Sequence, residues 1–216
     1  WTIPIALQPD FGAVLVYALT FVLVYACMNG PLRHLLVTGL AALPVLITTV
    51  ATTPYLRDRW LGFVAPEQHL ETAGWHIVQF QRTLASGGIF GHAFGKAVWS
   101  QNYLPFGYSD SIFATIGESI GLFGLLPFIL LILAWVLYGY RKAHGSRDLW
   151  VMGTVLGMVC MIAGQAFVHL SVNLGLCPPT GITLPLISYG GSSLVATLAS
   201  VGIVEGLTRS EREAER

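Results

Sequence analysis

Long apolar runs separated by short polar segments dominate the chain. A helix needs about 20 mainly apolar residues to cross a hydrocarbon core about 30 Å thick. Because each run is continuously apolar rather than alternating, the pattern predicts helices and not the strands of a barrel. It therefore predicts an all-α fold, a polytopic membrane helix bundle with about five transmembrane spans, at residues 11–28, 35–53, 111–140, 150–176 and 183–207.

Composition agrees with a membrane protein. The chain is 54% hydrophobic and 10% charged, whereas soluble domains carry about 25% charged residues. The net charge is zero and the basic residues are spread out, so we expect no nucleic-acid partner. The three cysteines lack metal-ligand spacing and are interpreted as packing residues. Since the chain starts at Trp1 without a signal-peptide pattern, we expect residues 1–216 to be a single transmembrane domain of a longer protein.

Basic residues predict the orientation. They cluster after the third run and in the tail, and short basic segments favour the cytoplasmic side; these residues are Arg141, Lys142, Arg147, Arg209, Arg212 and Arg216. Residues 54–110 then face outward. A loop of this length is rarely a mere connector, and the mixed composition of residues 74–98 predicts short amphipathic helices at the interface. We expect a long structured outer loop that caps the bundle.

Asp110 is the leading functional candidate. It lies at the threshold of the third run, whose one charged residue is Glu118, and an aspartate deep in lipid costs roughly 2.5 to 3.5 kcal/mol or more. The alternative is an N-terminal helix cap. Glu118 lies about two helical turns deeper on the same face, where it could pair with a basic group or form a structural hydrogen bond with a neighbouring helix.

Other polar groups interrupt the last two runs. Residues 188–193 follow Pro185 and could kink a helix so that it lines a cavity, but close packing through small residues is favoured. Gln165, His169 and Asn173 form an i, i+4, i+8 stripe that must face the bundle, along a substrate path or, more commonly, in interhelical hydrogen bonds. Asp10 precedes the first run as a cap or a cavity residue.

Six ordered blocks carry a family resemblance. They are QPDFG at 8–12, Tyr55-x-Arg57-x-Arg59, GWHIVQ at 74–79, SGGIFG at 86–91, YLPFGYSDSIFATIGE at 103–118 and NLGLCPPTGITLPLISYGGSS at 173–193. In order and spacing the chain resembles the C-terminal half of the SEDS family (shape, elongation, division and sporulation), the peptidoglycan glycosyltransferases of the FtsW/RodA type.

The resemblance implies an inverting glycosyltransferase that polymerises lipid II on the outer face of the bacterial cytoplasmic membrane, with a cytoplasmic C-terminus. By motif, Asp110 is the aspartate that this reaction requires. It could act as general base on a sugar 4-hydroxyl, or hold Mg or Mn against the diphosphate, in which case it is the metal ligand. The residues do not decide between these roles.

The remaining candidates would bind substrate. Arg57, Arg59 and Lys96 could pair with the diphosphate, or be solvated charges. Gln79 and Ser86 could hydrogen-bond the sugar or diphosphate, or hold the loop fold. Glu118 and Ser188 complete this set.

One motif departs from the family pattern. The family reads Leu-Pro-Glu, two residues, then Thr-Asp-Phe-Ile-Phe, whereas here Phe106 replaces the glutamate and Ser109 and Ser111 flank Asp110. A second acidic group is therefore lost. The resemblance also implies partners, a class B penicillin-binding protein and other divisome or elongasome membrane proteins. Two alternatives stay open, a lipid II flippase and a non-catalytic scaffold of the division complex.

Overall fold

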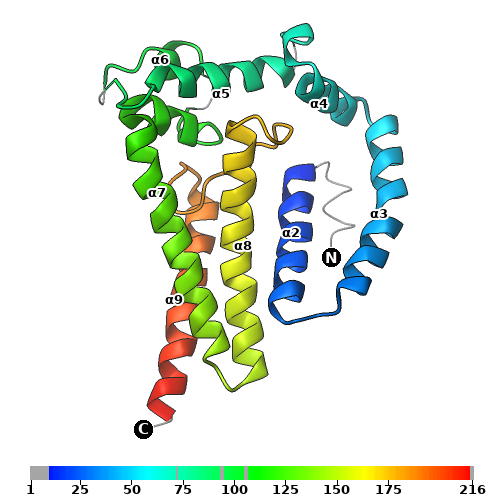
Figure 1. Cartoon of the computed structure of the whole chain (residues 1–216), viewed down its shortest axis with the longest axis vertical. Helices are drawn as coiled ribbons and strands as arrows, with labels where there is room; N and C mark the ends of the chain where they lie inside the picture. The colour runs from blue at the N-terminus through cyan, green and yellow to red at the C-terminus, as the bar shows by residue number, and fades with distance from the viewer. Residues whose placement is uncertain (1–9, 72, 93–94, 105–106, 215–216) are drawn as a thin grey trace.

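Apolar helices form the body of the protein. A computed structural model describes residues 10–71, 73–92, 95–104 and 107–214, with side chains up to residue 210 except at residue 73. Within these described residues, four helices are long and apolar enough to cross a membrane, and α2 is a shorter apolar helix. The prediction of an all-α polytopic membrane bundle is confirmed. The helices are α2 (Phe11–Cys27), α3 (Leu32–Thr52), α7 (Ile112–His144), α8 (Leu149–Asn173) and α9 (Gly191–Ala214) (Figure 1).

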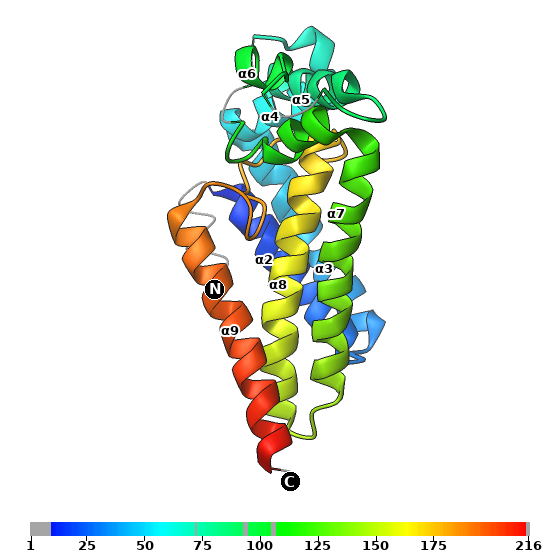
Figure 2. The ribbon, with the colours of Figure 1, turned by 90° about the vertical axis from the view of Figure 1, so that its left-hand side faces the viewer.

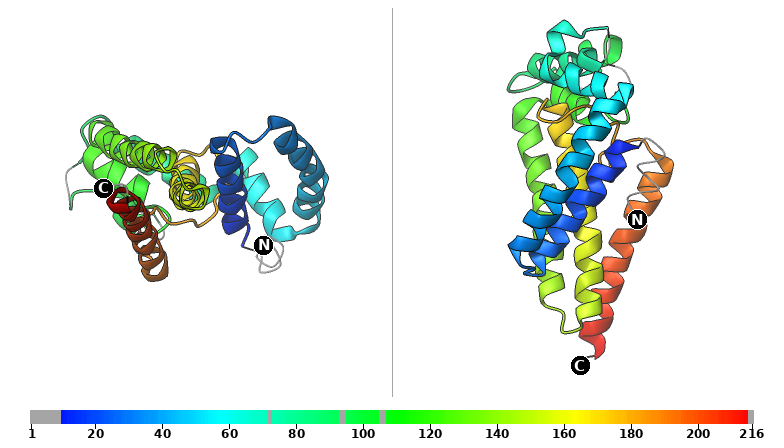
Figure 3. Two further views of the ribbon diagram at one scale, coloured as in Figure 1. Left: turned by 90° about the horizontal axis from the view of Figure 1, so that it is seen from below. Right: turned by 90° about the vertical axis from the view of Figure 1, so that its right-hand side faces the viewer.

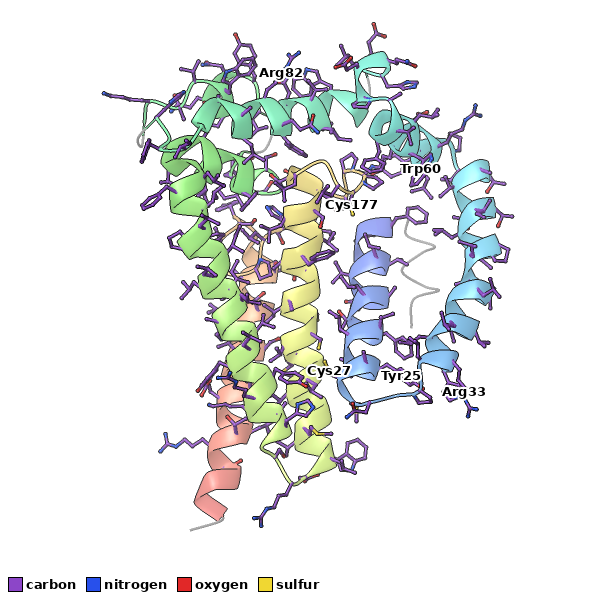
Figure 4. The ribbon with its side chains drawn as sticks, in the orientation of Figure 1. Tyr25, Cys27, Arg33, Trp60, Arg82 and Cys177 are labelled. Atoms are coloured by element: carbon purple, nitrogen blue, oxygen red, sulfur yellow. The ribbon has the colours of Figure 1, made fainter. Side chains whose placement is uncertain are left out.

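Shorter helices lie across one end of this body (Figures 1 and 2). We call residues 54–104 the cap; its helices are α4 (Pro54–Val64), the 3₁₀ turn η1 (Pro66–Gln68), α5 (Ala73–Gly87) and α6 (Trp99–Asn102). Pro54 opens α4 at a position where its missing N–H costs nothing. In α5, Ile77 and Phe80 are almost fully buried while Gln81 and Arg82 are exposed, so the helix is amphipathic (Figure 4).

Helix α8 is the centre of the bundle. It packs against α2, α7 and α9, and Figure 3 shows it between them. Its buried residues Val155, Leu156 and Val159 form a cluster with Ala143 of α7 and Val204 of α9. Apolar side chains on several sides of α8 pack against other helices. The helix is therefore held firmly, and it holds in place the segments to which its polar residues bind.

Helix α3 is the opposite case. None of its residues is buried, and it lies at the edge of the molecule in two views (Figures 1 and 3). It packs against α4. At its other end the Tyr25 hydroxyl and His34 Nδ1 are 2.6 Å apart. A continuously apolar helix with this exposure is suited to lipid contact.

The structure corrects the predicted start of the fifth span. The predicted run at 183–207 begins in a loop, and α9 starts only at Gly191. Pro185 has no N–H to donate, and Leu186 has a φ of 66° that no helix contains. Ser188 and Tyr189 therefore do not kink a helix. They belong to the loop of residues 174–190 that joins α8 to α9.

Helix α7 is broken at Gly121, which the hydrophobic pattern does not reveal. Gly121 has φ 66° and ψ −175°, and the cap hairpin around Gly88 fills the break. The N–H groups of Leu122 and Phe123 donate to the carbonyls of Gly88 and Ile89, each at 3.0 Å. The freed backbone groups are thus satisfied, as a membrane helix requires.

Candidate functional site

Asp110 lies in the turn that leads into α7. The N-terminal cap residue of α7 is Ser111, so the interpretation of Asp110 as the helix cap is wrong. The Asp110 carboxylate accepts a hydrogen bond from the Ser109 hydroxyl at 3.1 Å. Asp10, by contrast, does cap its helix, because its carboxylate accepts from the N–H of Ala13 at 3.0 Å.

A cleft of about 410 Å³ opens where the cap meets the bundle, and Asp110 lines it. We call it the charged cleft, because two further carboxylates, an arginine and a histidine line it as well. The lining residues come from α4, from the segment into α5, from α5, from the turn into α7, from the end of α8 and from the α8–α9 loop. They are Tyr55, Asp58, Arg59, Glu71, His76, Phe80, Asp110, Val172, Pro179, Gly181 and Ile182.

Arg59 is the predicted cation that the structure brings to this cleft. Its guanidinium lies 4.3 Å from the centre of the Tyr55 ring, a cation–π contact that orients the side chain. Arg57 instead lines an apolar groove together with α3 residues and Trp60. Lys96 is exposed and lines neither. The two arginines of one motif therefore line different surfaces: Arg59 lines the charged cleft, and Arg57 lines the apolar groove.

His76 is a cleft residue that the sequence pattern did not single out. Burial lowers the pKa of His76 from its ordinary value of 6.5; the Asp110 carboxylate acts against this shift, and the positive charge of Arg59 adds to it. The imidazole is therefore mainly neutral at physiological pH. Its ring contacts Trp75 and Phe80, with centroids 5.5 and 6.3 Å away.

The polar stripe of α8 holds the cleft's inner wall. Asn173 Nδ2 donates to the Asp110 carbonyl and to the His169 carbonyl, each at 3.0 Å, and Asn173 Oδ1 accepts from the N–H of Ala114 at 3.2 Å. His169 Nδ1 lies 2.7 Å from the Ile182 carbonyl. Gln165 donates to the Thr183 carbonyl at 3.0 Å. The stripe faces the bundle, as predicted, and its contacts are structural hydrogen bonds.

Ser188 fastens the loop that carries Asp110. Its buried hydroxyl donates to the Ser109 carbonyl and accepts from the N–H of Leu184, both at 2.6 Å. The N–H of Tyr189 donates to the Tyr108 carbonyl at 2.8 Å. The geometry therefore gives Ser188 a positioning role rather than a place in the cleft.

Glu118 stabilises the N-terminus of α6, a helix of the cap. It is fully buried, and its carboxylate accepts from the N–H groups of Val98, Trp99 and Ser100 at 2.8 to 3.0 Å. These are the amides at the start of α6, where a carboxylate is favourable. The structural hydrogen bond considered for Glu118 is the one observed, with the cap as partner. It does not line the charged cleft.

Gln79 and Ser86 face the protein interior. Gln79 is buried, and the Ser86 hydroxyl donates to the Thr83 carbonyl at 2.8 Å. The Ser86 bond supports a role in holding the loop fold, whereas the side-chain oxygen of Gln79 is buried with no hydrogen-bond partner among the described residues. Phe106, which replaces the family's glutamate, lies outside the described residues.

A preformed metal cage does not fit this site. Within the part of the chain that the structure describes, no three His, Cys, Asp or Glu side chains come together as a candidate metal site. A hard cation such as Mg²⁺ takes about six oxygen ligands. Asp110 would leave most of them to other molecules, so we derive no step through a metal ion.

Sequence reasoning missed Tyr55, Asp58, Glu71 and His76. Three of these lie inside or beside the blocks Tyr55-x-Arg57-x-Arg59 and GWHIVQ, so the motifs did mark the right segments. Which residues of an α4 turn face the cleft depends on how α4 lies on α5. That arrangement is tertiary, and no periodicity in the sequence encodes it.

Comparison with known proteins agrees with these motifs. The family model for FtsW, RodA and SpoVE, described as "Cell cycle protein", matches residues 1–213. A probable peptidoglycan glycosyltransferase FtsW of Trichlorobacter lovleyi is 34% identical over 91% of this chain and 52% of its own length. Stage V sporulation protein E of Bacillus subtilis is 33% identical over 95% of this chain and 56% of its own.

A solved structure has the same fold. It is a chain from work on the structural coordination of polymerization and crosslinking by a peptidoglycan synthase complex. The TM-score is 0.72 at 34% identity, covering 94% of this chain and 56% of the other. The chain spans about half the length of the curated relatives it matches. These similarities, with the membrane helices and the ordered motifs, show that the chain is a multi-pass membrane protein that belongs to the SEDS family of FtsW, RodA and SpoVE.

Proposed function

We propose that the protein is a peptidoglycan glycosyltransferase that polymerises lipid II, with Asp110 as general base. The observation that carries the proposal is that Asp110 and Arg59 line one cleft from two different elements, the turn into α7 and helix α4. Relatives over most of this chain are named probable peptidoglycan glycosyltransferases, which supports the reaction class.

The chemistry is a single displacement at an anomeric carbon. The 4-hydroxyl oxygen of one sugar forms the new bond to C1 of the other, while the bond from C1 to the lipid diphosphate breaks. The Asp110 carboxylate accepts the hydroxyl proton, and the diphosphate leaves with the electron pair. One displacement inverts the configuration at C1, which is why we assign an inverting mechanism.

Arg59 suits the leaving group. A guanidinium bonds two phosphate oxygens at once, and it stabilises charge that grows as the bond to C1 breaks. Its stacking on Tyr55 restricts the side chain before substrate arrives. Asp58 and Glu71 also line the cleft; their charges repel a diphosphate, whereas the charge of Arg59 attracts it.

The charge distribution supports a cap on the outer face. Arg141 and Lys142 lie in the last turn of α7, at the end of the bundle opposite the cap (Figure 1). Such basic ends favour the cytoplasm. Asp110 would then meet lipid II outside the bacterial cytoplasmic membrane, and the C-terminus would be cytoplasmic.

The structure favours catalysis over flipping. A flippase path through the bundle needs polar groups along the membrane depth. In α8 the polar residues Gln165, His169 and Asn173 are instead engaged by nearby loops. A non-catalytic scaffold would not need a carboxylate and an arginine facing one cleft.

The same proposal extends to a partner. The similar solved chain comes from a peptidoglycan synthase complex that joins polymerization to crosslinking. We therefore assign a class B penicillin-binding protein as the partner that crosslinks the new strand, together with other divisome or elongasome membrane proteins.

The test is lipid II polymerisation by the full-length protein with its penicillin-binding protein, comparing wild type with Asp110→Asn. Amide replacement keeps the shape and removes the base, so we expect a loss of about 10²- to 10⁴-fold. Equal melting temperatures and equal lipid II binding must accompany it. Equal polymer from both would exclude Asp110 as the base. No polymer from wild type with a competent partner would favour the flippase or scaffold.

A further inference from the structure

A second cleft of about 490 Å³ lies beside the loop that carries Asp110. Tyr108 lines this cleft, and Asp110, two residues later, lines the charged one. The loop of residues 107–110 therefore contributes to both. The other lining residues come from the segment around α6 and from the first two turns of α7; they are Gly95, Ala97, Ser100, Gln101, Leu104, Gly107, Ile112, Thr115 and Ser119.

The two clefts differ in charge. The charged cleft has Asp58, Arg59, Glu71, His76 and Asp110. Among the described residues, none that lines the second cleft is charged; their polar side-chain groups are hydroxyls and one amide. We call it the neutral cleft. A diphosphate finds no cation among these residues, so the lining suits an uncharged, polar ligand.

The hydroxyls of α7 present acceptors to the neutral cleft. Thr115 donates its proton to the Gly107 carbonyl at 2.9 Å, and Ser119 donates to the Thr115 carbonyl at 3.0 Å. Their oxygen lone pairs remain as acceptors. Gln101, which is exposed, adds both a donor and an acceptor in its amide. Donors and acceptors of this kind match the hydroxyl and acetamido groups of a sugar.

Tyr108 adds an aromatic face. Its side chain is 59% exposed, yet its position is held, because the N–H of Tyr189 donates to the Tyr108 carbonyl at 2.8 Å and the two rings meet edge to face at 5.8 Å. The negative face of an aromatic ring attracts the C–H groups of a sugar ring. A side chain with two torsions pays little entropy for this contact.

We propose that the neutral cleft binds the saccharide of the acceptor, the substrate that presents its 4-hydroxyl to Asp110. This inference rests on the proposed function. The donor's diphosphate would lie beside Arg59 in the charged cleft, and the acceptor's N-acetylated sugars would lie against Tyr108 and Gln101. The base then stands on the loop between the two saccharides, as a transfer between them requires.

The first experiment measures saccharide binding without turnover. The probe is N,N′,N″,N‴-tetraacetylchitotetraose, a neutral and lipid-free oligomer, titrated against the full-length protein in nanodiscs by saturation-transfer NMR. We expect wild type and Asp110→Asn to bind equally, and Tyr108→Ala and Gln101→Ala to bind about tenfold more weakly. Tyr103→Ala and Asn102→Ala are the matched controls, because both residues are exposed nearby and line neither cleft.

The second experiment separates this inference from the proposed function. In lipid II polymerisation, Tyr108→Ala and Gln101→Ala should raise KM with little change in kcat, at melting temperatures within the spread of the two controls. Polymerisation with unchanged KM, or a wild type that does not bind the oligomer, would overturn the neutral cleft as an acceptor site. Tyr108-dependent binding by a protein that fails to polymerise would instead refute the proposed reaction and leave a saccharide site.

Discussion

The two walls of the charged cleft are built in different ways. The wall with Asp110 is tied to α8 through Asn173 and to the α8–α9 loop through Ser188. The wall with Arg59 belongs to α4, in which Gly62 is the buried residue, and α4 continues from α3, which has no buried residue. One wall is anchored in the core and the other is carried by exposed helices.

This difference suits the two chemical tasks. A general base must stand at a defined distance from the hydroxyl it deprotonates, since small displacements reduce the rate strongly. A cation that binds a diphosphate tolerates movement, because charge attraction varies slowly with distance. Elements with few buried contacts are also those that open locally at low cost.

The largest effect is expected from releasing the anchored wall. Asn173→Leu removes the hydrogen bond that Asn173 donates to the partly buried Asp110 carbonyl and the one that it accepts from the buried N–H of Ala114, and leucine replaces neither. We expect a loss of about 1–3 kcal/mol in stability and about 10²-fold in polymerisation, because Asp110 is displaced. Activity assays and melting temperatures measure the two effects.

Thr154→Val is the matched control for Asn173→Leu. Thr154 lies in the same helix, is exposed, and donates only to the Trp150 carbonyl of its own helix. Thr154→Val should change the free energy of unfolding by no more than about 0.5 kcal/mol, and the polymerisation rate by a correspondingly small factor. If Asn173→Leu polymerised lipid II as well as this control, the anchored wall would not position the base.

Most of the membrane architecture follows from the sequence, for a simple physical reason. A span must be long and apolar, so α2, α3, α7 and α8 can be read from local composition. The start of α9 cannot, because residues 183–190 are as apolar as a span. What keeps them out of the helix is Pro185 together with hydrogen bonds from Gln165 and His169, which come from another helix.

The candidate site could be predicted only in part. Asp110 was identifiable because a charge at a membrane threshold needs a reason. Its neighbours were not, since Arg57 and Arg59 are both cations in one motif and only the tertiary packing of α4 separates them. Glu118 has the same charge as Asp110 and lies on the same helix face by spacing. Its carboxylate, however, accepts hydrogen bonds from the amides at the start of α6.

The next largest effect is expected on the exposed wall, where substitutions of Arg59 and Arg57 are compared. Arg59→Ala should lower kcat/KM for lipid II about 10- to 100-fold, which corresponds to one charge-assisted hydrogen bond. Arg57→Ala should stay within about twofold, because Arg57 lies in the apolar groove with Trp60. Equal losses in the two variants would show that the wall acts through net charge, and the comparison of walls would fail.

The smallest expected effect is the pH dependence of polymerisation that comes from His76, which lines the same cleft as Asp110 and Arg59. Its pKa is lowered mainly by burial, against the opposing charge of Asp110 and with the help of Arg59; Asp58 and Glu71 face the same cleft. Because the pKa in the folded state lies below the unfolded value of 6.5, the stability that neutral His76 gives is present above pH 6.5 and is lost as pH falls through the folded pKa. There the imidazolium also pairs with Asp110 and weakens it as a base.

Measuring polymerisation from about pH 8 to about pH 5.5 tests this effect. We expect the activity of wild type to fall more steeply on acidification than that of His76→Gln, by a few-fold, because glutamine keeps a polar side chain and cannot gain the charge. His92→Gln is the control, since His92 is exposed and lies outside the cleft; its profile should follow wild type. If His76→Gln also followed wild type, the acid limb would belong to the carboxylates alone, and the histidine would not couple the anchored wall to the exposed one.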